Sequence, residues 1–350
     1  MRSTLSPDGT ELKERWAEFR LANPKTRIRD AANELGTTEA ELLATGLGEN
    51  VSLLEGDFRE LMKEMGSLGH VMALTRNDHV VHERKGVYEK ISFNNHVGLV
   101  LGEDIDLRLF LGDWKFGFAV SENDRHSLQF FNSFGEAAHK IYLTEKSSKE
   151  AYDALVAKYL AADQNVKLNI TEKTEKAAEP NAEVEIDVPA FQAEWLGLKD
   201  THDFFTLLRK YKLSRKQALR HAPEGYAYRI KPESMKLVFE AVSETGLPIM
   251  VFVSNQNCIQ IHTGPIKKIF VMGPWLNIMD PEFNLHLRED AIDEAWIVRK
   301  PTEDGIVTGI ELIDKEGVMF NQFFGKRKPG IPELKEWPEL LERTVIKTDL

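Results

Sequence analysis

The chain has 350 residues, of which 42% are hydrophobic, and its 56 Asp/Glu against 45 Lys/Arg give a formal net charge of −11. This length predicts two domains, since a single core seldom exceeds about 250–300 residues. The acidic balance argues against generic nucleic-acid binding, and the single cysteine, Cys258, excludes an intramolecular disulfide and a Cys-rich metal site. The polar residues 1–9 speak against a signal peptide, and no apolar run approaches the roughly 20 residues of a membrane span. We therefore expect a cytoplasmic protein with no nucleic-acid partner and no membrane span.

Residues 26–43 have the pattern of a helix-turn-helix, with Thr37 or Thr38 as the N-cap of the second helix. A helix that reads DNA presents Arg, Lys, Asn or Gln to the bases, whereas this one offers Glu39 and Glu41. The first fifty residues also carry seven Lys/Arg against nine Asp/Glu. A transcription regulator is therefore disfavoured on charge, and we interpret this region as a structural helical hairpin.

Short runs rich in β-formers, bounded by Gly, Asn and Asp, follow in each half of the chain. They lie at residues 70–75, 80–83, 97–101, 107–111 and 128–132, and then at 248–253, 258–262, 268–272, 294–298 and 309–313. Sequential strands with short turns favour antiparallel pairing. Cys258 falls inside one of these runs, so we expect it in the core.

His79 and His82 form a His-Val-Val-His motif that invites a metal-binding interpretation. Residues three apart in a strand point to opposite faces of the sheet, so the pair would not chelate an ion. We expect solvated strand histidines instead.

The chain repeats itself. With an offset of 178, residues 70–120 fall on residues 248–298 without a gap, and with an offset of 182 residues 128–132 fall on 310–314. The apolar pattern keeps step throughout, which predicts an internal duplication. Between the copies the sequence is charged, poor in aromatics and interrupted by Pro180, as linkers are. We expect an α+β fold of two similar halves, residues 1–162 and 189–350, joined by a linker of residues 163–188, each half with N-terminal helices and a large, mainly antiparallel sheet.

A helix is predicted to begin near His202, with Asp200 or Thr201 able to cap it. His202, Phe205 and Arg209 share one face of this helix. Seven Lys/Arg against two Asp in residues 199–220 make the segment basic within an acidic chain. A histidine beside aromatics and cations suits a planar ligand with a Lewis-acid centre and anionic arms, and the alternative is an ordinary capping-region histidine on a basic helix.

Two further segments are ordinary when taken alone. Residues 103–111 alternate charged and apolar residues around Arg108, which is typical of a solvent-facing strand or a paired charge. Residues 321–330 close the last strand and turn into a basic loop.

Together, the Asp-Thr-His-Asp-Phe-Phe, Ser-Arg-Lys-Gln-Ala-Leu, Asp-Ile-Asp-Leu-Arg-Leu-Phe and Gln-Phe-Phe-Gly-Lys-Arg segments resemble the HemS/HmuS/ChuS/PhuS family of cytoplasmic haem-handling proteins. The resemblance covers nearly the whole chain. It implies haem b as the ligand, held in a cleft between the halves. It also implies His202 as the proximal ligand of the haem iron and Arg108 as the distal residue. The family's remaining haem-pocket positions fall on Arg215, Phe252, Lys300, Gln322 and Arg327, whereas Asn321 stands where some relatives have an aromatic hydroxyl.

The resemblance implies one of two functions. In the first, the protein degrades haem to release iron, as a haem oxygenase does, with O2 and an electron donor. In the second, it is a haem chaperone that carries haem from an importer to a separate haem oxygenase. The same residues serve both functions because binding and activation need the same ligand, so the choice stays open at the level of sequence.

Overall fold

The computed structural model describes residues 9–122, 124–173, 185–328 and 330–348. The polar residues 1–8 and the middle of the predicted linker, residues 174–184, lie outside the described residues. The chain forms two compact units. Unit 1 comprises Met1–Arg76, Glu83–Thr174 and Asn255–Gln260, and unit 2 comprises Asn77–His82, Glu175–Ser254 and Ile261–Leu350.

The first half of the chain supplies most of unit 1. Its elements are α1 (Gly9–Ala22), α2 (Ile28–Leu35), α3 (Glu39–Ala44), β1 (Val51–Leu54), α4 (Phe58–Lys63), the 3-10 turn η1 (Met65–Leu68), β2 (Gly69–Arg76), β3 (Val80–Gly86), β4 (Ile91–Phe93), β5 (Gly98–Leu101), β6 (Asp106–Leu109), η2 (Leu111–Asp113), β7 (Trp114–Glu122), β8 (Arg125–Asn132), β9 (Ala137–Ser147) and α5 (Lys149–Tyr159).

The second half supplies most of unit 2 in nearly the same order. Its elements are α6 (Val188–Leu196), α7 (Asp203–Tyr211), α8 (Arg215–Arg220), β10 (Ala227–Ile230), α9 (Ser234–Thr245), β11 (Ile249–Ser254), β12 (Cys258–Gly264), β13 (Ile269–Met272), β14 (Trp275–Met279), β15 (Phe283–Arg288), η3 (Glu289–Ala291), β16 (Glu294–Thr302), β17 (Gly305–Ile313), β18 (Met319–Gly325) and α10 (Glu336–Thr344).

The two units share one topology. In unit 1 the strands run in the order β1-β7-β8-β9-β2, and in unit 2 their counterparts run β10-β16-β17-β18-β11. A smaller set of antiparallel strands is repeated in the same way, and its order is β6-β5-β4 in one unit and β15-β14-β13 in the other. Pairing along β7-β8-β9 and along β16-β17-β18 is antiparallel. The α+β class and the duplicated two-half fold predicted from the sequence are confirmed.

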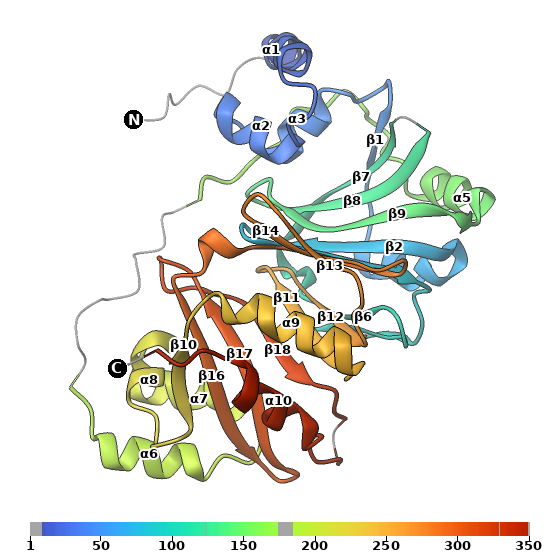
Figure 1. Ribbon diagram of the computed structural model, residues 1–350. Helices are drawn as coiled ribbons and strands as arrows, with labels where there is room; N and C mark the ends of the chain where they lie inside the picture. Colours follow the sequence, from blue (N-terminus) through green and yellow to red (C-terminus); the bar gives the residue numbers. More distant parts are fainter. Residues whose placement is uncertain (1–8, 123, 174–184, 329, 349–350) are drawn as a thin grey trace. The chain divides into compact units, whose positions relative to one another are not determined.

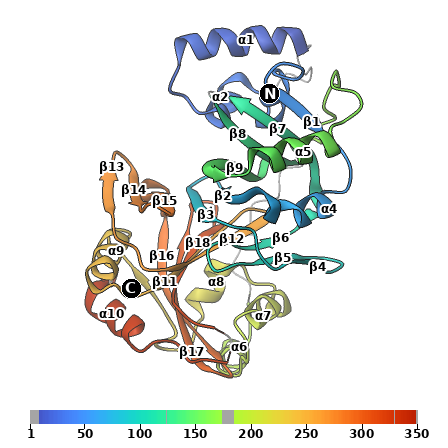
Figure 2. The same ribbon diagram turned by 90° about the vertical axis from the view of Figure 1, so that its right-hand side faces the viewer.

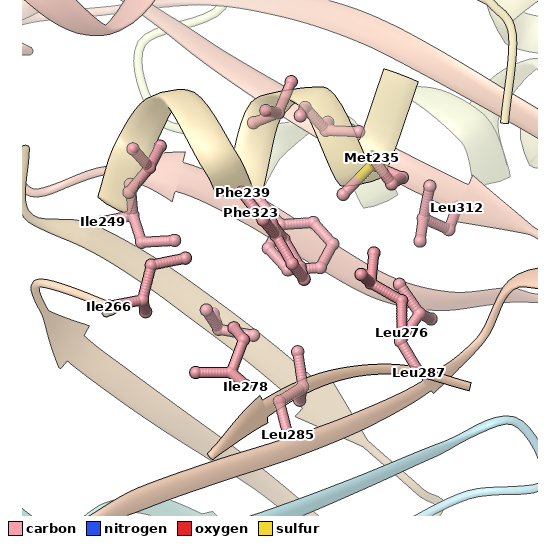
Figure 3. Packing of buried hydrophobic residues seen from close by; sticks show 14 of the residues in the cluster. Met235, Phe239, Ile249, Ile266, Leu276, Ile278, Leu285, Leu287, Leu312 and Phe323 are labelled. Atoms are coloured by element: carbon pink, nitrogen blue, oxygen red, sulfur yellow. The ribbon is translucent and has the colours of Figure 1, made fainter. Parts of the chain in front are cut away.

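Helices cover both faces of the main sheet in unit 2 (Figure 1). Along β16, Ala295 and Ile297 join the core beneath α9 and α10, whereas Trp296 and Val298 join the core beneath α6, α7 and α8. This alternation follows from the two-residue period of a strand. In the first core, Met235 and Phe239 on α9 point toward sheet residues that include Leu312 (Figure 3). Strand β16 therefore presents every second residue to the three N-terminal helices of the unit.

Unit 1 is layered in the same way (Figure 2). Leu128 and Phe130 on β8 pack with residues of α4 and α5. On the other face Phe118 and Phe131 pack with Ala40 of α3. The predicted helical hairpin is present, since α2 and α3 are joined at Gly36, whose φ of 68° is favoured by glycine. Thr38 caps α3 in a capping box with Glu41.

The turns at corresponding ends of β2 and β11 are exchanged between the units. Asn77 belongs to unit 2, where its side-chain amide donates to the carbonyls of Ser254 and Phe320. Asn255, its counterpart at an offset of 178, belongs to unit 1, where its amide donates to the carbonyls of Arg76 and Ala138.

The exchange overturns the expectation for the two histidines. His82 is not a solvated histidine, and the side chain of His79 is only 22% exposed. His82 is fully buried with its ring 5.0 Å from that of Phe283, and Nε2 of His79 lies 3.2 Å from Oδ2 of Asp314. The segment is packed inside unit 2, which its position in the sequence does not reveal. Cys258 is fully buried in the core of unit 1, as expected.

All ten predicted β-runs overlap strands of the structure, while β1, β7 and β9 complete the sheet of unit 1 beyond them. No described helix is long and apolar enough to cross a membrane.

Candidate functional site

The predicted axial histidine stands at the start of α7. His202 is the N-cap residue itself, and its side chain is 88% exposed. Oδ1 of Asp200 accepts from the backbone N–H of His202 at 2.7 Å and lies 2.5 Å from Nδ1 of the imidazole. These contacts hold the pKa of the Asp200 carboxyl below its usual range. A carboxylate on Nδ1 favours the tautomer that carries its proton there, which leaves Nε2 with a lone pair for a metal.

Three of the predicted haem-contacting residues converge on one residue that the sequence did not single out. Arg215, in the first turn of α8, donates hydrogen bonds from Nε and Nη2 to the carboxylate of Glu311 on β17, at 2.6 and 2.7 Å. Nζ of Lys300 lies 2.8 Å from the same carboxylate, and Nε2 of Gln322 lies 3.1 Å away. We refer to these four residues as the Glu311 cluster. It combines two cations with one anion and therefore carries a net charge of +1.

Aromatic rings flank the cations of this cluster. The guanidinium carbon of Arg215 lies 5.3 Å from the ring centroid of Phe204 and 5.5 Å from that of Phe205, and Nζ of Lys300 lies 4.6 Å from the centroid of Phe204. Cations at these distances are attracted to the ring faces. Phe204 is buried, whereas Phe205 is 54% exposed one turn from His202, so an apolar surface adjoins both the imidazole and the cluster.

Phe252 belongs to the same face of the sheet. It lies on β11 directly opposite Gln322 on β18, which in turn lies opposite Glu311 on β17. The backbone carbonyl of Phe252 accepts a hydrogen bond from the side-chain amide of Asn321. Asn321, which stands where some relatives have an aromatic hydroxyl, therefore stabilises the pairing of the two strands. The structure thus brings Arg215, Phe252, Lys300 and Gln322 together.

Arg327 follows the end of β18. Its Nη2 lies 3.4 Å from Oδ2 of Asp304, and its charge contributes to the lowered pKa of the Asp200 carboxyl. Arg327 further opposes the effect of burial on Glu333, whose pKa burial raises to about 7. Arg327 therefore adds positive charge that acts on the carboxylate paired with His202.

Arg108 belongs to the other unit. It lies on β6, where its guanidinium pairs with Asp106 and its side chain is 31% exposed. Burial raises the pKa of the Asp106 carboxyl, although Arg108 opposes this effect. A guanidinium stays protonated, so Arg108 offers hydrogen-bond donors and a fixed charge but no lone pair for a metal.

A cavity of about 420 Å³ lies in unit 1 between β1, α4 and the start of β7, lined by Leu54, Phe58, Trp114 and neighbouring residues. None of the predicted site residues lines it. The predicted site residues lie instead at the N-terminal helices and main sheet of unit 2 and, in the case of Arg108, on β6 of unit 1.

Sequence reasoning missed two residues of this site as partners. Glu311 carried a signal, since it interrupts the apolar run Ile310-Glu311-Leu312-Ile313 in a strand covered on both faces, where a charge requires a partner. Asp200 was considered only as a cap, and its contact with the ring of His202 depends on the turn that precedes α7.

The arrangement in unit 2 can bind a planar anionic ligand that contains a metal. His202 supplies one imidazole nitrogen, Phe205 an apolar face, and the Glu311 cluster a surplus positive charge. Among the described residues no group of three or more His, Cys, Asp or Glu side chains could hold a bare metal ion. A metal that brings its own equatorial ligands, as haem iron does, needs only the axial ligand.

Comparisons with known proteins agree on one family. The model of the haemin-degrading HemS.ChuX domain matches residues 36–159 and 212–344. The hemin transport protein HmuS of Yersinia pestis is 37% identical over 96% of this chain and 98% of its own length. The crystal structure of holo-PhuS, a heme-binding protein from Pseudomonas aeruginosa, is 44% identical with a TM-score of 0.93, covering 98% of this chain and 100% of that one. The heme-degrading enzyme ChuS of Escherichia coli O157:H7 is 33% identical with a TM-score of 0.89, covering 97% and 100%.

Proposed function

Because the chain belongs to the family of the haemin-degrading HemS.ChuX domain, we propose that it binds haem through His202 and degrades it to release iron. Haem is then both ligand and substrate, and O2 together with an electron donor supplies the oxidation. We place this activity in the cytoplasm, downstream of a haem importer.

The observation that carries the proposal is the Asp200–His202 pair. The 2.5 Å contact to Nδ1 fixes the ring and directs Nε2 away from the carboxylate, as a histidine ligand of iron requires. The imidazole is exposed at a helix start, so a ligand can reach it without unfolding the helix. The surplus positive charge of the Glu311 cluster and Arg327 suits the two propionates of haem, since charge-assisted hydrogen bonds to carboxylates are the stronger kind.

Arg108 is proposed as the distal residue. Its guanidinium can donate hydrogen bonds to a distal water or to oxygen without competing for the metal. Donors aimed at an oxygen that gains negative charge lower the barrier of the step in which that charge develops.

A second function, a haem chaperone that delivers haem to a separate oxygenase, uses the same residues. The exposure of His202 favours it, because an exposed ligand can be exchanged for that of a partner. The relative from Yersinia pestis is also named for transport.

One experiment separates the two functions. The purified protein is titrated with haem, and the complex is then exposed to air with a reductant, catalase and superoxide dismutase. Saturation of the Soret band at one haem per chain, followed by its loss with chelatable iron and an open-chain tetrapyrrole, is the expected result. A Soret band that survives these conditions but moves to an added haem oxygenase would favour the chaperone, and the absence of saturable binding would refute both.

Arg108→Ala tests the distal assignment. The variant should keep stoichiometric haem binding, because His202 and the Glu311 cluster are untouched, but it should turn over about 10²-fold more slowly. The rate of Soret loss and the identity of the tetrapyrrole are the measurements. Wild-type rate and products would remove Arg108 from the distal role.

A further inference from the structure

We propose that Glu311 is a positioning residue that aims Arg215 and Lys300 at one carboxylate of the bound haem. The inference rests on the proposed function, because it takes haem as the ligand. Glu311 does not touch the ligand in this account but acts through the two cations.

The geometry of Arg215 gives the first argument. A guanidinium has two edges that can each hold a carboxylate. Glu311 takes the edge formed by Nε and Nη2, at 2.6 and 2.7 Å. Among the described residues none accepts a hydrogen bond from Nη1 of Arg215. The edge formed by Nη1 and Nη2 therefore remains for a second carboxylate, and Glu311 fixes the direction in which that edge points.

Charge and burial give the second argument. Arg215 is 8% exposed, Lys300 5% and Glu311 0%. Buried cations without an anion are costly, and one carboxylate compensates only one of the two. Burial opposes ionisation of Glu311, yet Arg215 and Lys300 outweigh that effect and lower the pKa of its carboxyl. Burial lowers the pKa of the Lys300 ammonium, and the same carboxylate opposes that effect. With both cations charged the cluster carries a net charge of +1, which one further carboxylate neutralises.

The position of Arg215 on its helix gives the third argument. Arg215 is the first residue of α8, where the helix dipole disfavours a cation. Ser214 and Gln217 already satisfy the helix start with a capping box, so Arg215 is not needed for capping. Its contacts are with Glu311 and the two phenylalanine rings, which indicates that the cation is there for the cluster.

The first half of the chain shows that the fold itself does not require a carboxylate at this place. At an offset of 182 the counterpart of Glu311 is Gln129, on β8 of unit 1. Gln129 is 7% exposed and donates to Ser127 at 3.0 Å. The same strand in the same topology is therefore compatible with a neutral side chain.

The test compares haem with haem dimethyl ester, in which both propionates are esterified. Dissociation rates of each from the full-length protein are measured by transfer to excess apomyoglobin. The wild type should release the ester at least about tenfold faster than haem, which corresponds to about 1.4 kcal/mol. Glu311→Gln should release haem at least about tenfold faster than the wild type does, while its release of the ester changes less than about twofold.

Glu39→Gln is the matched control. It removes a buried carboxylate that pairs with Lys140 and Arg76 in unit 1, so it weakens the fold in a comparable way without touching the Glu311 cluster. It should leave both release rates unchanged. If Glu311→Gln fails to fold, Glu311→Asp keeps the charge but shortens the side chain, and it should accelerate haem release selectively by a smaller factor.

Each other outcome has a definite meaning. Equal acceleration of haem and ester release in the Glu311 variants would show a purely structural role and overturn the proposal. Unchanged or slower haem release would do the same. Equal release of haem and ester by the wild type would show that the cations do not hold a propionate, which also overturns it. Failure of the wild type to bind either ligand would refute the proposed function itself.

Discussion

The corner between the N-terminal helices and the sheet carries opposite charges in the two units. Helices α3 and α8 both begin after a hydroxyl cap with a capping box, Thr38 in one and Ser214 in the other. The first residue of α3 is Glu39, whereas the first residue of α8 is Arg215. One helix start therefore presents an anion to its sheet and the other a cation.

The residues that pair with these two side chains also carry opposite charges in the two units. Glu39 pairs with Arg76 and, at 2.5 Å, with Nζ of Lys140 on β9. At an offset of 182 the counterpart of Lys140 is Gln322, and the acidic residue of unit 2 is instead Glu311 on the central strand. The same fold therefore tolerates either an anion or a cation at the start of this helix, provided that each buried charge pairs with an opposite charge.

The preceding helices differ in chemistry in the same way. His202 is the N-cap of α7, and the corresponding N-cap of α2 is Arg27. An arginine cannot coordinate iron, so the duplicated position in unit 1 lacks the axial ligand. The proposed function therefore expects the haem iron at unit 2, although both units contain the same helix pair.

Replacing the N-cap residues of α7 and α2 should give the largest difference between the two units. His202→Ala should weaken haem binding at least about 10³-fold, or about 4 kcal/mol, because the iron–imidazole bond is lost. Arg27→Ala, at the matching position, should change the affinity less than about twofold. Soret titrations of both variants measure this, and an unchanged spectrum and affinity for His202→Ala would remove it from the axial role.

Removing the buried carboxylate of Glu39 in unit 1 should have the next largest effect. Burial opposes ionisation of Glu39, but Lys140 and Arg76 outweigh it and lower its pKa from 4.5 to about 2. A depressed pKa adds stability above pH 4.5 that is lost as the pH falls toward 2. Glu39→Gln should therefore lower the free energy of unfolding by about 3 kcal/mol at pH 7 and by less than about half of that at pH 3. Urea unfolding at both pH values decides, and a difference independent of pH would contradict the ion-pair account.

The half-buried carboxylate of Glu333 in unit 2 should behave in the opposite way. Burial raises the pKa of Glu333 to about 7, against the effect of the Thr308 backbone N–H that it accepts at 2.9 Å. A raised pKa costs stability progressively as the pH rises from about 4.5 through about 7. Glu333→Gln should thus be more stable than the wild type by about 2 kcal/mol at pH 8, with no gain at pH 4. Urea unfolding of the two proteins at these pH values is the measurement, and a gain that is equal at both pH values would exclude titration of Glu333 as its cause.

The smallest effect concerns the C-caps of α2 and α7. Gly36 ends α2 with a φ of 68°, and Lys212 ends α7 with a φ of 54°. A left-handed conformation costs a lysine about 1 kcal/mol relative to glycine. Lys212→Gly should therefore raise the stability by up to about 1 kcal/mol, and Gly36→Ala should lower it by a similar amount, both read from thermal unfolding. A loss of stability in Lys212→Gly would show that the lysine makes contacts worth more than the strain.

Much of the fold could be predicted from the sequence because its signals are local. Alternating apolar residues indicate strands, and their repetition at offsets of 178 and 182 indicates the duplication. The capping role of Thr38 is visible for the same reason, since a hydroxyl three residues before Glu41 needs no tertiary partner. The residues of the candidate site came from resemblance to a family, because a lone histidine or arginine has no local pattern that distinguishes a ligand from a surface residue.

The packing of His79 and His82 within unit 2 could not be predicted from the sequence. Both lie in a segment that belongs to unit 2 although the chain around it builds unit 1. A two-residue period states which side chains share a face, but it does not state what covers that face. The solvated histidines expected from the motif are therefore wrong for a reason that no local pattern contains.

The sequence by itself determined the class, the duplication, the N-terminal helices of each half and the acidic, single-cysteine character of the chain. Only the tertiary structure decided which charges meet. Arg215 and Glu311 are 96 residues apart in the chain, and Nδ1 of His202 meets Asp200 only because the turn before α7 folds back on itself. Periodicity depends on the geometry of a single element, whereas an ion pair depends on how separate elements pack, and that packing is fixed by the whole core.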